Sequence, residues 1–158
     1  MKKLNLPLLA VSLGLPLLAG GVGSAFTVQA IPTWYAGLNK PFFNPPNWIF
    51  GPVWTLLYIL MGIAFYLVLT TKTAKRLRQT AIIYFVIQMA LNAGWSIVFF
   101  SWQQPLVALV VVVGLWLSIV ACIISFQKIN ILAARLLYPY LAWVTFASLL
   151  NMAIVLLN

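Results

Sequence analysis

The sequence has no aspartate, no glutamate and no histidine among its 158 residues. Side-chain carboxylates and imidazoles supply most general acids and bases, most ligands of Mg²⁺ and Zn²⁺, and the proton relays of membrane pumps. Their absence excludes paired-acid hydrolysis, a Ser-His-Asp triad and a carboxylate or histidine metal cage. We therefore expect no catalytic residue of this kind, no metal site and no obligatory cofactor, and ion-coupled transport is disfavoured.

Cysteine and charge are also scarce. The one cysteine, Cys122, lies in an apolar run and is interpreted as a small buried hydrophobic residue. Charged residues make up 6% of the chain, and all are lysine or arginine, so the formal net charge is +9. Hydrophobic residues make up 65%, against ~45–50% in soluble domains. Membrane lipid, and not nucleic acid, is therefore the expected surrounding of this surface.

Five apolar segments are each close to the ~20 residues that cross a bilayer as a helix. They are Leu4–Val28, Trp48–Thr70, Gln79–Phe100, Leu106–Phe126 and Leu132–Leu157. They account for most of the chain, and the sequence has no internal repeat. It therefore predicts an all-α integral membrane protein, a single domain over residues 1–158 built as a bundle of five transmembrane helices.

The positive charges lie almost entirely on one side of this arrangement. One side carries Lys2, Lys3, Lys72, Lys75, Arg76, Arg78, Lys128 and Arg135. The other side carries only Lys40. By the positive-inside rule the amino terminus and the basic loops are expected in the cytoplasm, and the connection Gln29–Asn47 outside. Because both termini are short, a bacterial cell membrane is favoured over a mitochondrial outer membrane.

The amino-terminal segment has a second interpretation. Met1-Lys2-Lys3, followed by an apolar run and small residues up to Ala30, resembles a cleavable signal peptide. The apolar run is long for that role, however, and Pro16 with the glycines between positions 20 and 23 suits close packing of helices. We expect the first span to be retained, with cleavage as the alternative.

Aromatic and amide side chains recur at helical spacing in three spans. At about 100° per residue, separate stripes hold Phe50, Trp54, Tyr58, Met61 and Phe65; Gln88, Asn92, Trp95 and Phe99; and Tyr140, Trp143, Ala147 and Asn151. Amides are costly in hydrocarbon unless paired, so these stripes should face the inside of the bundle. They would line a flat apolar cavity for a planar polycyclic ligand. The alternative, preferred on spacing alone, is that they only hold the helices together.

The connection Gln29–Asn47 ends in a run with three prolines, from Lys40 to Asn47, which stiffens the backbone. This run predicts a shaped lid at one end of the bundle. The alternative is a rigid interfacial loop in which Trp34, Tyr35 and Trp48 are ordinary aromatic-belt anchors.

The opposite face of the third span carries a pair of small residues, Ala90 and Gly94, among Ile83, Ile87 and Ile97. Small residues four apart let two helices approach closely. A homodimer contact and packing within the monomer both remain open.

A larger ordered set of residues extends over nearly the whole chain from Trp34 onward. It comprises Trp34-Tyr35-Ala36-Gly37-Leu38, Lys40-Pro41, Pro45-Pro46, Gly51-Pro52-Val53-Trp54, Leu57-Tyr58, Met61-Gly62, Gln88, Leu91-Asn92, Trp95, Phe99-Phe100 and the run from Leu132 to Trp143. In type and order this set resembles the TspO/MBR family, the translocator proteins or peripheral-type benzodiazepine receptors.

The resemblance implies a five-helix bundle, often dimeric, with a pocket under the first loop. That pocket accepts porphyrins such as protoporphyrin IX, synthetic benzodiazepine-site ligands and, in animal members, cholesterol. Carried over by position, it is lined by Tyr35, Trp54, Tyr58, Gln88, Asn92, Trp95, Trp143, Ala147 and Asn151. Lys40 or backbone N–H groups of the lid are expected to face the porphyrin propionates at the mouth. Haem is a weaker candidate, since no histidine is present to ligate iron.

The function implied is a membrane receptor or carrier for tetrapyrroles, in transport or stress signalling, rather than an enzyme. One alternative is light-dependent porphyrin breakdown, in which Trp54, Trp95 and Trp143 donate electrons to the excited ring. Another is a structural protein that binds lipid or sterol. Sterol binding through the animal motif is in doubt, since the segment Leu150–Leu157 lacks its tyrosine and basic residue. An acidic residue of relatives is also absent at Val111.

The predicted topology can be tested with reporters at the two ends of the chain. Because five is an odd number of spans, a reporter fused before Met1 and one fused after Asn158 should lie in opposite compartments. Green fluorescent protein, which fluoresces in the cytoplasm, and alkaline phosphatase, which is active outside it, make this distinction. Reporters on the same side would show that the number of spans is wrong or that the first segment is removed.

Overall fold

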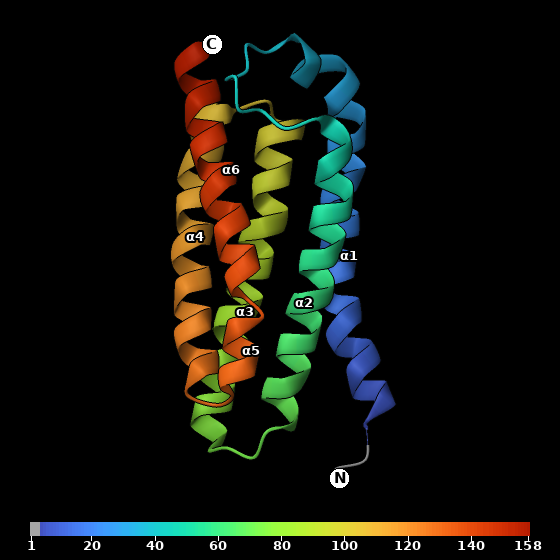
Figure 1. The fold of residues 1–158 in the computed structure, drawn as a ribbon, viewed down its shortest axis with the longest axis vertical. Helices are drawn as coiled ribbons and strands as arrows, with labels where there is room; N and C mark the ends of the chain where they lie inside the picture. The colour runs from blue at the N-terminus through green and yellow to red at the C-terminus, as the bar shows by residue number, and fades with distance from the viewer. Residues whose placement is uncertain (1–3) are drawn as a thin grey trace.

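The computed structural model describes residues 4–158. Its helical elements are α1 (Leu6–Ala30), the π-helical turn η1 (Ile31–Tyr35), the 3-10 turn η2 (Asn47–Ile49), α2 (Phe50–Thr70), α3 (Lys75–Ser96), the π-helical turn η3 (Ile97–Ser101), α4 (Pro105–Gln127), α5 (Ile131–Arg135) and α6 (Tyr138–Leu157). They form five apolar stretches long enough to cross a membrane. Figure 1 shows these stretches side by side along the long axis of the molecule. The prediction of an all-α, five-helix membrane bundle is confirmed.

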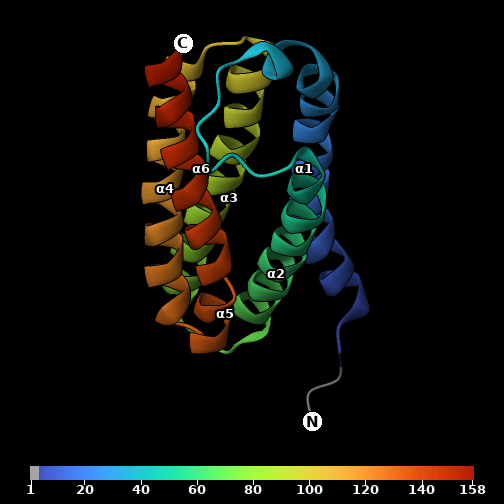
Figure 2. The same cartoon turned by 45° about the horizontal axis from the view of Figure 1, so that its top comes forward.

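The helices form a ring. Helix α1 packs against α2 and α3, α3 against α4, α4 against α6, and the short α5 reaches α2. Aromatic side chains bridge α2 and α6, with ring centroids 6.1 Å apart for Phe50 and Trp143 and 6.2 Å apart for Trp54 and Tyr140. The connection from η1 to α2 crosses the end of the bundle and passes beside α6 (Figure 2).

The half of the bundle away from this connection is filled by stacked rings. Phe65 and Phe85 stack with centroids 4.1 Å apart and an interplanar angle of 3°. Phe126 continues the stack, 6.0 Å from Phe85. Phe85 and Phe126 are almost completely buried, as are Val68 and Ala81 beside them in the same core. This end of the bundle is therefore solid.

The first span is longer than predicted. We expected it to end at Val28, but its helix continues through η1 to Tyr35. Pro32 lies in this turn and has no backbone N–H to donate, which normally ends or kinks a helix. The wider π-helical turn absorbs the proline, and the Thr33 hydroxyl donates to the carbonyl of Gln29 at 2.8 Å. The lid accordingly begins after Tyr35.

The fifth span is interrupted, whereas we expected one helix over Leu132–Leu157. Pro139 cannot donate the hydrogen bond that would continue α5, and the chain passes through a tight turn in which Leu137 N–H donates to Ala134 O at 3.1 Å. The third span differs at its start, because α3 begins at Lys75 instead of Gln79. Lysine and arginine are good helix formers, so the basic residues extend the helix.

The small-residue pair on α3 has no partner within the described monomer. Ala90 is exposed, and a methyl group added at Gly94 would meet nothing within 4 Å. Ile83 and Ile87 on the same face are 57% and 42% exposed. Packing of this face inside the monomer, one of the two interpretations left open above, is therefore not what the structure shows.

The contact between α1 and α2 depends on glycine. A methyl group at Gly62 would lie 2.8 Å from the Cα atom of Leu13 and 2.9 Å from the carbonyl oxygen of Ser12. Both neighbours are backbone atoms, which cannot move aside without shifting the helix. The absence of a side chain at Gly62 thus sets the distance between these two spans.

Gly62→Ala is therefore expected to lower the free energy of unfolding by ~1–3 kcal/mol, because the added methyl group forces α1 and α2 apart. Unfolding can be followed with a thiol-reactive fluorescent dye, since the only cysteine, Cys122, is 1% exposed in the folded chain. Gly114→Ala in α4 is the matched control, because nothing lies within 4 Å of the added methyl group. The free energy of unfolding of this control variant should be unchanged or higher. Equal loss in both variants would contradict the packing argument.

Candidate functional site

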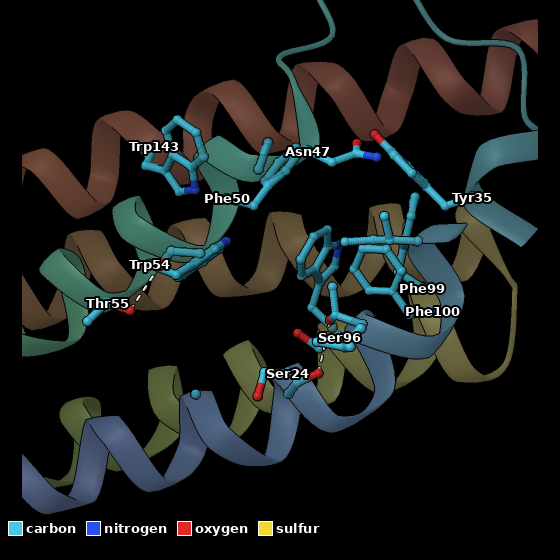
Figure 3. A pocket seen from close by; sticks show the side chains of 18 of the residues that line it. Ser24, Tyr35, Asn47, Phe50, Trp54, Thr55, Ser96, Phe99, Phe100 and Trp143 are labelled. Carbon is cyan, nitrogen blue, oxygen red and sulfur yellow. Dashed lines mark hydrogen bonds between the residues drawn. The ribbon is translucent and has the colours of Figure 1, made fainter. Parts of the chain in front are cut away.

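A cavity of about 520 Å³ lies in the end of the bundle covered by the lid. Its volume falls within the ~300–1,000 Å³ typical of small-molecule pockets. Helices α1, α2, α3 and α6 and the turns η1, η2 and η3 contribute its walls, and no residue of α4 does. Figure 3 shows side chains from these separate elements converging on one space.

The open side of the cavity lies between α1 and the start of α2. The lining residues that are exposed all come from these two segments: Leu17, Gly21, Ser24, Val28, Asn47, Trp48, Gly51 and Thr55. Two of their hydroxyl groups bond to their own helices, Ser24 to Gly21 O at 2.9 Å and Thr55 to Gly51 O at 2.9 Å. This side is therefore open to the surroundings of the bundle, and half of its residues are glycine, serine or threonine.

Aromatic side chains form the inner walls. Trp54 stacks on Tyr58 with centroids 5.5 Å apart, and Trp95 stacks on Phe99 at the same distance. Trp143 lies against Phe50 of α2 (Figure 3). Three tryptophans from three different spans thus present their rings to one cavity, as the sequence stripes predicted.

Two indole N–H groups differ in their partners. Trp95 Nε1 donates to Asn151 Oδ1 at 3.2 Å, and Asn151 Nδ2 donates to Pro105 O at 2.8 Å, so this ring is fixed to α6 and α4. Trp143 Nε1 is buried and has no acceptor in the described part of the chain. An unpaired buried donor is costly, so this indole N–H lowers the stability of the bundle.

Behind the wall, Asn92 links two tyrosines of neighbouring helices. Tyr58 donates its hydroxyl hydrogen to Asn92 Oδ1 at 2.8 Å, and Asn92 Nδ2 donates to the Tyr140 hydroxyl at 3.1 Å. Gln88, one turn away on α3, has Nε2 at 3.9 Å from Met61 Sδ. Asn92 and Gln88 are 2% and 1% exposed and lie outside the cavity lining.

The lid is fastened at both of its ends. The Tyr35 hydroxyl donates to Asn44 Oδ1 at 2.7 Å. Asn39 and Asn158 exchange two hydrogen bonds, from Asn39 N–H to Asn158 Oδ1 at 3.0 Å and from Asn158 Nδ2 to Asn39 O at 3.1 Å. The lid is thus tied to the carboxyl end of α6, which agrees with a shaped cover.

Lys40 belongs to the lid itself. Its Nζ donates to Leu38 O at 3.0 Å and to Ala36 O at 3.2 Å, and it lies 5.0 Å from the centre of the Tyr35 ring. It does not line the cavity. Of the ten residues predicted for the site, seven line it: Tyr35, Trp54, Tyr58, Trp95, Trp143, Ala147 and Asn151. Lys40, Gln88 and Asn92 support the lid or the wall from outside.

The sequence analysis missed the contribution of α1. Gly20, Gly23, Ser24 and Thr27 all line the cavity. Any side chain at Gly20 would collide with the ring of Tyr58, so this glycine leaves room for an aromatic wall residue. The signal was present, because these small residues follow the spacing i, i+3, i+4, i+7 of one helix face.

The chain was compared with known proteins. The model of the TspO/MBR family matches residues 12–157. The chain is 46% identical to the tryptophan-rich protein TspO of Chlorobaculum tepidum over 150 residues, which is 95% of each chain. It is 45% identical to the protein of the same name from Archaeoglobus fulgidus, over 98% of this chain and 99% of that one. It is 41% identical to the human translocator protein, over 86% of this chain and 81% of that one. The chain therefore belongs to the TspO/MBR family.

Proposed function

We propose that this multi-pass membrane protein is a receptor or carrier that binds a planar tetrapyrrole of the protoporphyrin IX type, or a benzodiazepine-site ligand, in the aromatic cavity. A membrane receptor or carrier role agrees with the family. The observation that supports the ligand is the convergence of Trp54, Trp95 and Trp143 on one cavity of about 520 Å³. Flat apolar rings stack well on such walls.

Stacking should supply most of the binding free energy. The chain has no carboxylate or histidine that could act on the ligand or bind its iron, so protoporphyrin IX fits better than haem. Because Lys40 already serves two lid carbonyls, we assign it a minor, indirect part in holding the propionates.

We also propose that the exposed face of α3 forms a homodimer contact. Ala90 and Gly94 leave room for the backbone of a second helix, and Ile83 and Ile87 beside them are exposed. Such a surface packs against either lipid or another copy, and small residues favour the copy.

We propose a cytoplasmic amino terminus in a bacterial cell membrane. Six cations, from Lys72 to Arg135, belong to the turns at one end of the bundle, and Lys40 belongs to the lid at the other. Lys2 and Lys3, which also entered the prediction, lie outside the described residues. The charge difference between the two ends favours this orientation.

Ligand binding should depend far more on Trp54 than on Lys40. Trp54→Ala removes a stacking wall and is expected to weaken protoporphyrin IX binding roughly tenfold or more. Lys40→Ala removes an exposed charge worth ~0.5–1 kcal/mol and should weaken binding only about two- to fivefold, with a smaller dependence on salt. Titration of the porphyrin Soret band with protein in phosphatidylcholine nanodiscs gives the dissociation constants.

Trp102→Ala serves as the control for this comparison. Trp102 is 62% exposed and does not line the cavity, so its loss should leave the dissociation constant unchanged. Loss of binding in Lys40→Ala with intact binding in Trp54→Ala would place the ligand at the membrane surface and reject the cavity.

Light-dependent porphyrin breakdown is a second candidate, supported by the same three tryptophans. An excited porphyrin held among them could take an electron from an indole without any acid or base, which leaves an indole radical cation and a reduced porphyrin that dissolved dioxygen then oxidises. Illumination of the complex should then give one defined product, detected by chromatography, which is absent in Trp143→Phe and still formed in Trp116→Phe, whose ring lies outside the cavity. A mixture of bleaching products, unchanged by Trp143→Phe, would reject this activity.

A further inference from the structure

We propose that the basic end of the bundle, around Arg78, is a binding site for the phosphate group of an anionic phospholipid. This site lies at the opposite end from the cavity. It does not depend on the function proposed above.

The site carries concentrated positive charge without any internal counter-ion. Lys72 lies in the turn between α2 and α3, Lys75 and Arg78 lie in the first turns of α3, and Lys128 lies in the turn between α4 and α5. Both turns are at the lower end of the molecule in Figure 1. Since the sequence has no aspartate or glutamate, the balancing negative charge must come from another molecule.

Hydrogen bonds hold the two basic turns together. Arg78 Nη2 donates to Thr71 O at 2.9 Å, and Asn130 Nδ2 donates to Thr71 Oγ1 at 3.0 Å. Thr71 lies in the first basic turn and Asn130 in the second. The cations therefore belong to one connected surface and are not spread over independent loops.

Arg78 is the residue of this surface best placed to bind phosphate. It is partly buried, and its Nε is enclosed by the protein, so only the Nη groups are available to a ligand. The bond to Thr71 uses one of the five N–H donors of the guanidinium. The remaining Nη donors form a fork that fits two phosphate oxygens.

The start of α3 favours an anion at the same place. Ala74 precedes the helix and provides no side-chain cap for its first N–H groups. The first helical residues, Lys75 and Arg76, add positive charge to the positive end of the helix dipole, an arrangement that is unfavourable without a bound anion. A phosphate group would satisfy both the N–H groups and the cations.

The surroundings favour a lipid over free phosphate. Leu77, next to Arg78, is 38% exposed, and Ile131 and Leu132 at the start of α5 are 48% and 53% exposed. Apolar side chains beside the cations match the boundary between the headgroup and the acyl chains of a phospholipid. Turns that join membrane-spanning helices belong near this boundary of the bilayer.

The test offers the purified full-length protein equal amounts of phosphatidylglycerol and phosphatidylcholine in detergent, and measures both bound lipids by native mass spectrometry. We expect phosphatidylglycerol to be preferred roughly tenfold. Arg78→Gln should remove this preference. The matched control Arg135→Gln removes the same charge from the same end, at an exposed residue, and should change the preference less than about twofold.

A second variant and a competition experiment distinguish the possible outcomes. Lys75→Gln leaves the bond between Arg78 and Thr71 intact and should reduce the preference for phosphatidylglycerol roughly fivefold. This variant replaces Arg78→Gln as the test if Arg78→Gln does not fold in the Cys122 dye assay. Equal losses in Arg78→Gln and Arg135→Gln would show diffuse attraction and overturn the site. Complete displacement of phosphatidylglycerol by millimolar inorganic phosphate would show a free anion as the occupant and overturn the lipid.

Discussion

The structure depends on one constraint: inside a bilayer every polar group needs a partner within the protein. This chain meets most of the constraint without a side-chain carboxylate, although Trp143 Nε1, Gln88 Oε1 and Arg78 Nε are buried without a partner in the described residues. Serine and threonine hydroxyls bond back to their own helices, as Ser12 does to Leu8 O and Ser148 to Val144 O. Amides connect different helices, and the Asn92 side chain joins Tyr58 of α2 to Tyr140 of α6. The bundle is thus held by uncharged hydrogen bonds and by close contacts at small residues.

The same bonds give the cavity its shape. Tyr58 is held from behind by Asn92, its ring lies against Gly20, and it stacks on Trp54. Trp95 is held by Asn151. Rings fixed in this way need little reordering when a flat molecule stacks on them, which favours binding. The sequence stripes were interpreted either as the lining of a cavity or as contacts that hold the helices together. The structure shows both, because the lining residues are held in place by the amides behind them.

Much of this could be predicted from the sequence, because hydrophobic length and helical period reflect the bilayer and the bundle directly. The helical period could not distinguish Trp54, which lines the cavity, from Asn92, which supports the wall. Both residues lie on the inward face of their helix, and only the packing of the helices decides which of them reaches the cavity. The contacts of Lys40 could not be predicted from the sequence, because a lysine in a loop has many partners within reach. In the structure its Nζ donates to two backbone carbonyls of the lid. The break at Pro139 and the wide turn at Pro32 follow from missing N–H groups, yet a proline alone does not tell which outcome the chain adopts.

The stack of Phe65, Phe85 and Phe126 has a consequence for passage across the membrane. These rings fill the half of the bundle beyond the cavity, so the cavity is closed at its inner end. A ligand of the kind proposed above would have no straight route from the cavity to the basic end. Crossing the membrane inside a single copy would require the three rings to separate.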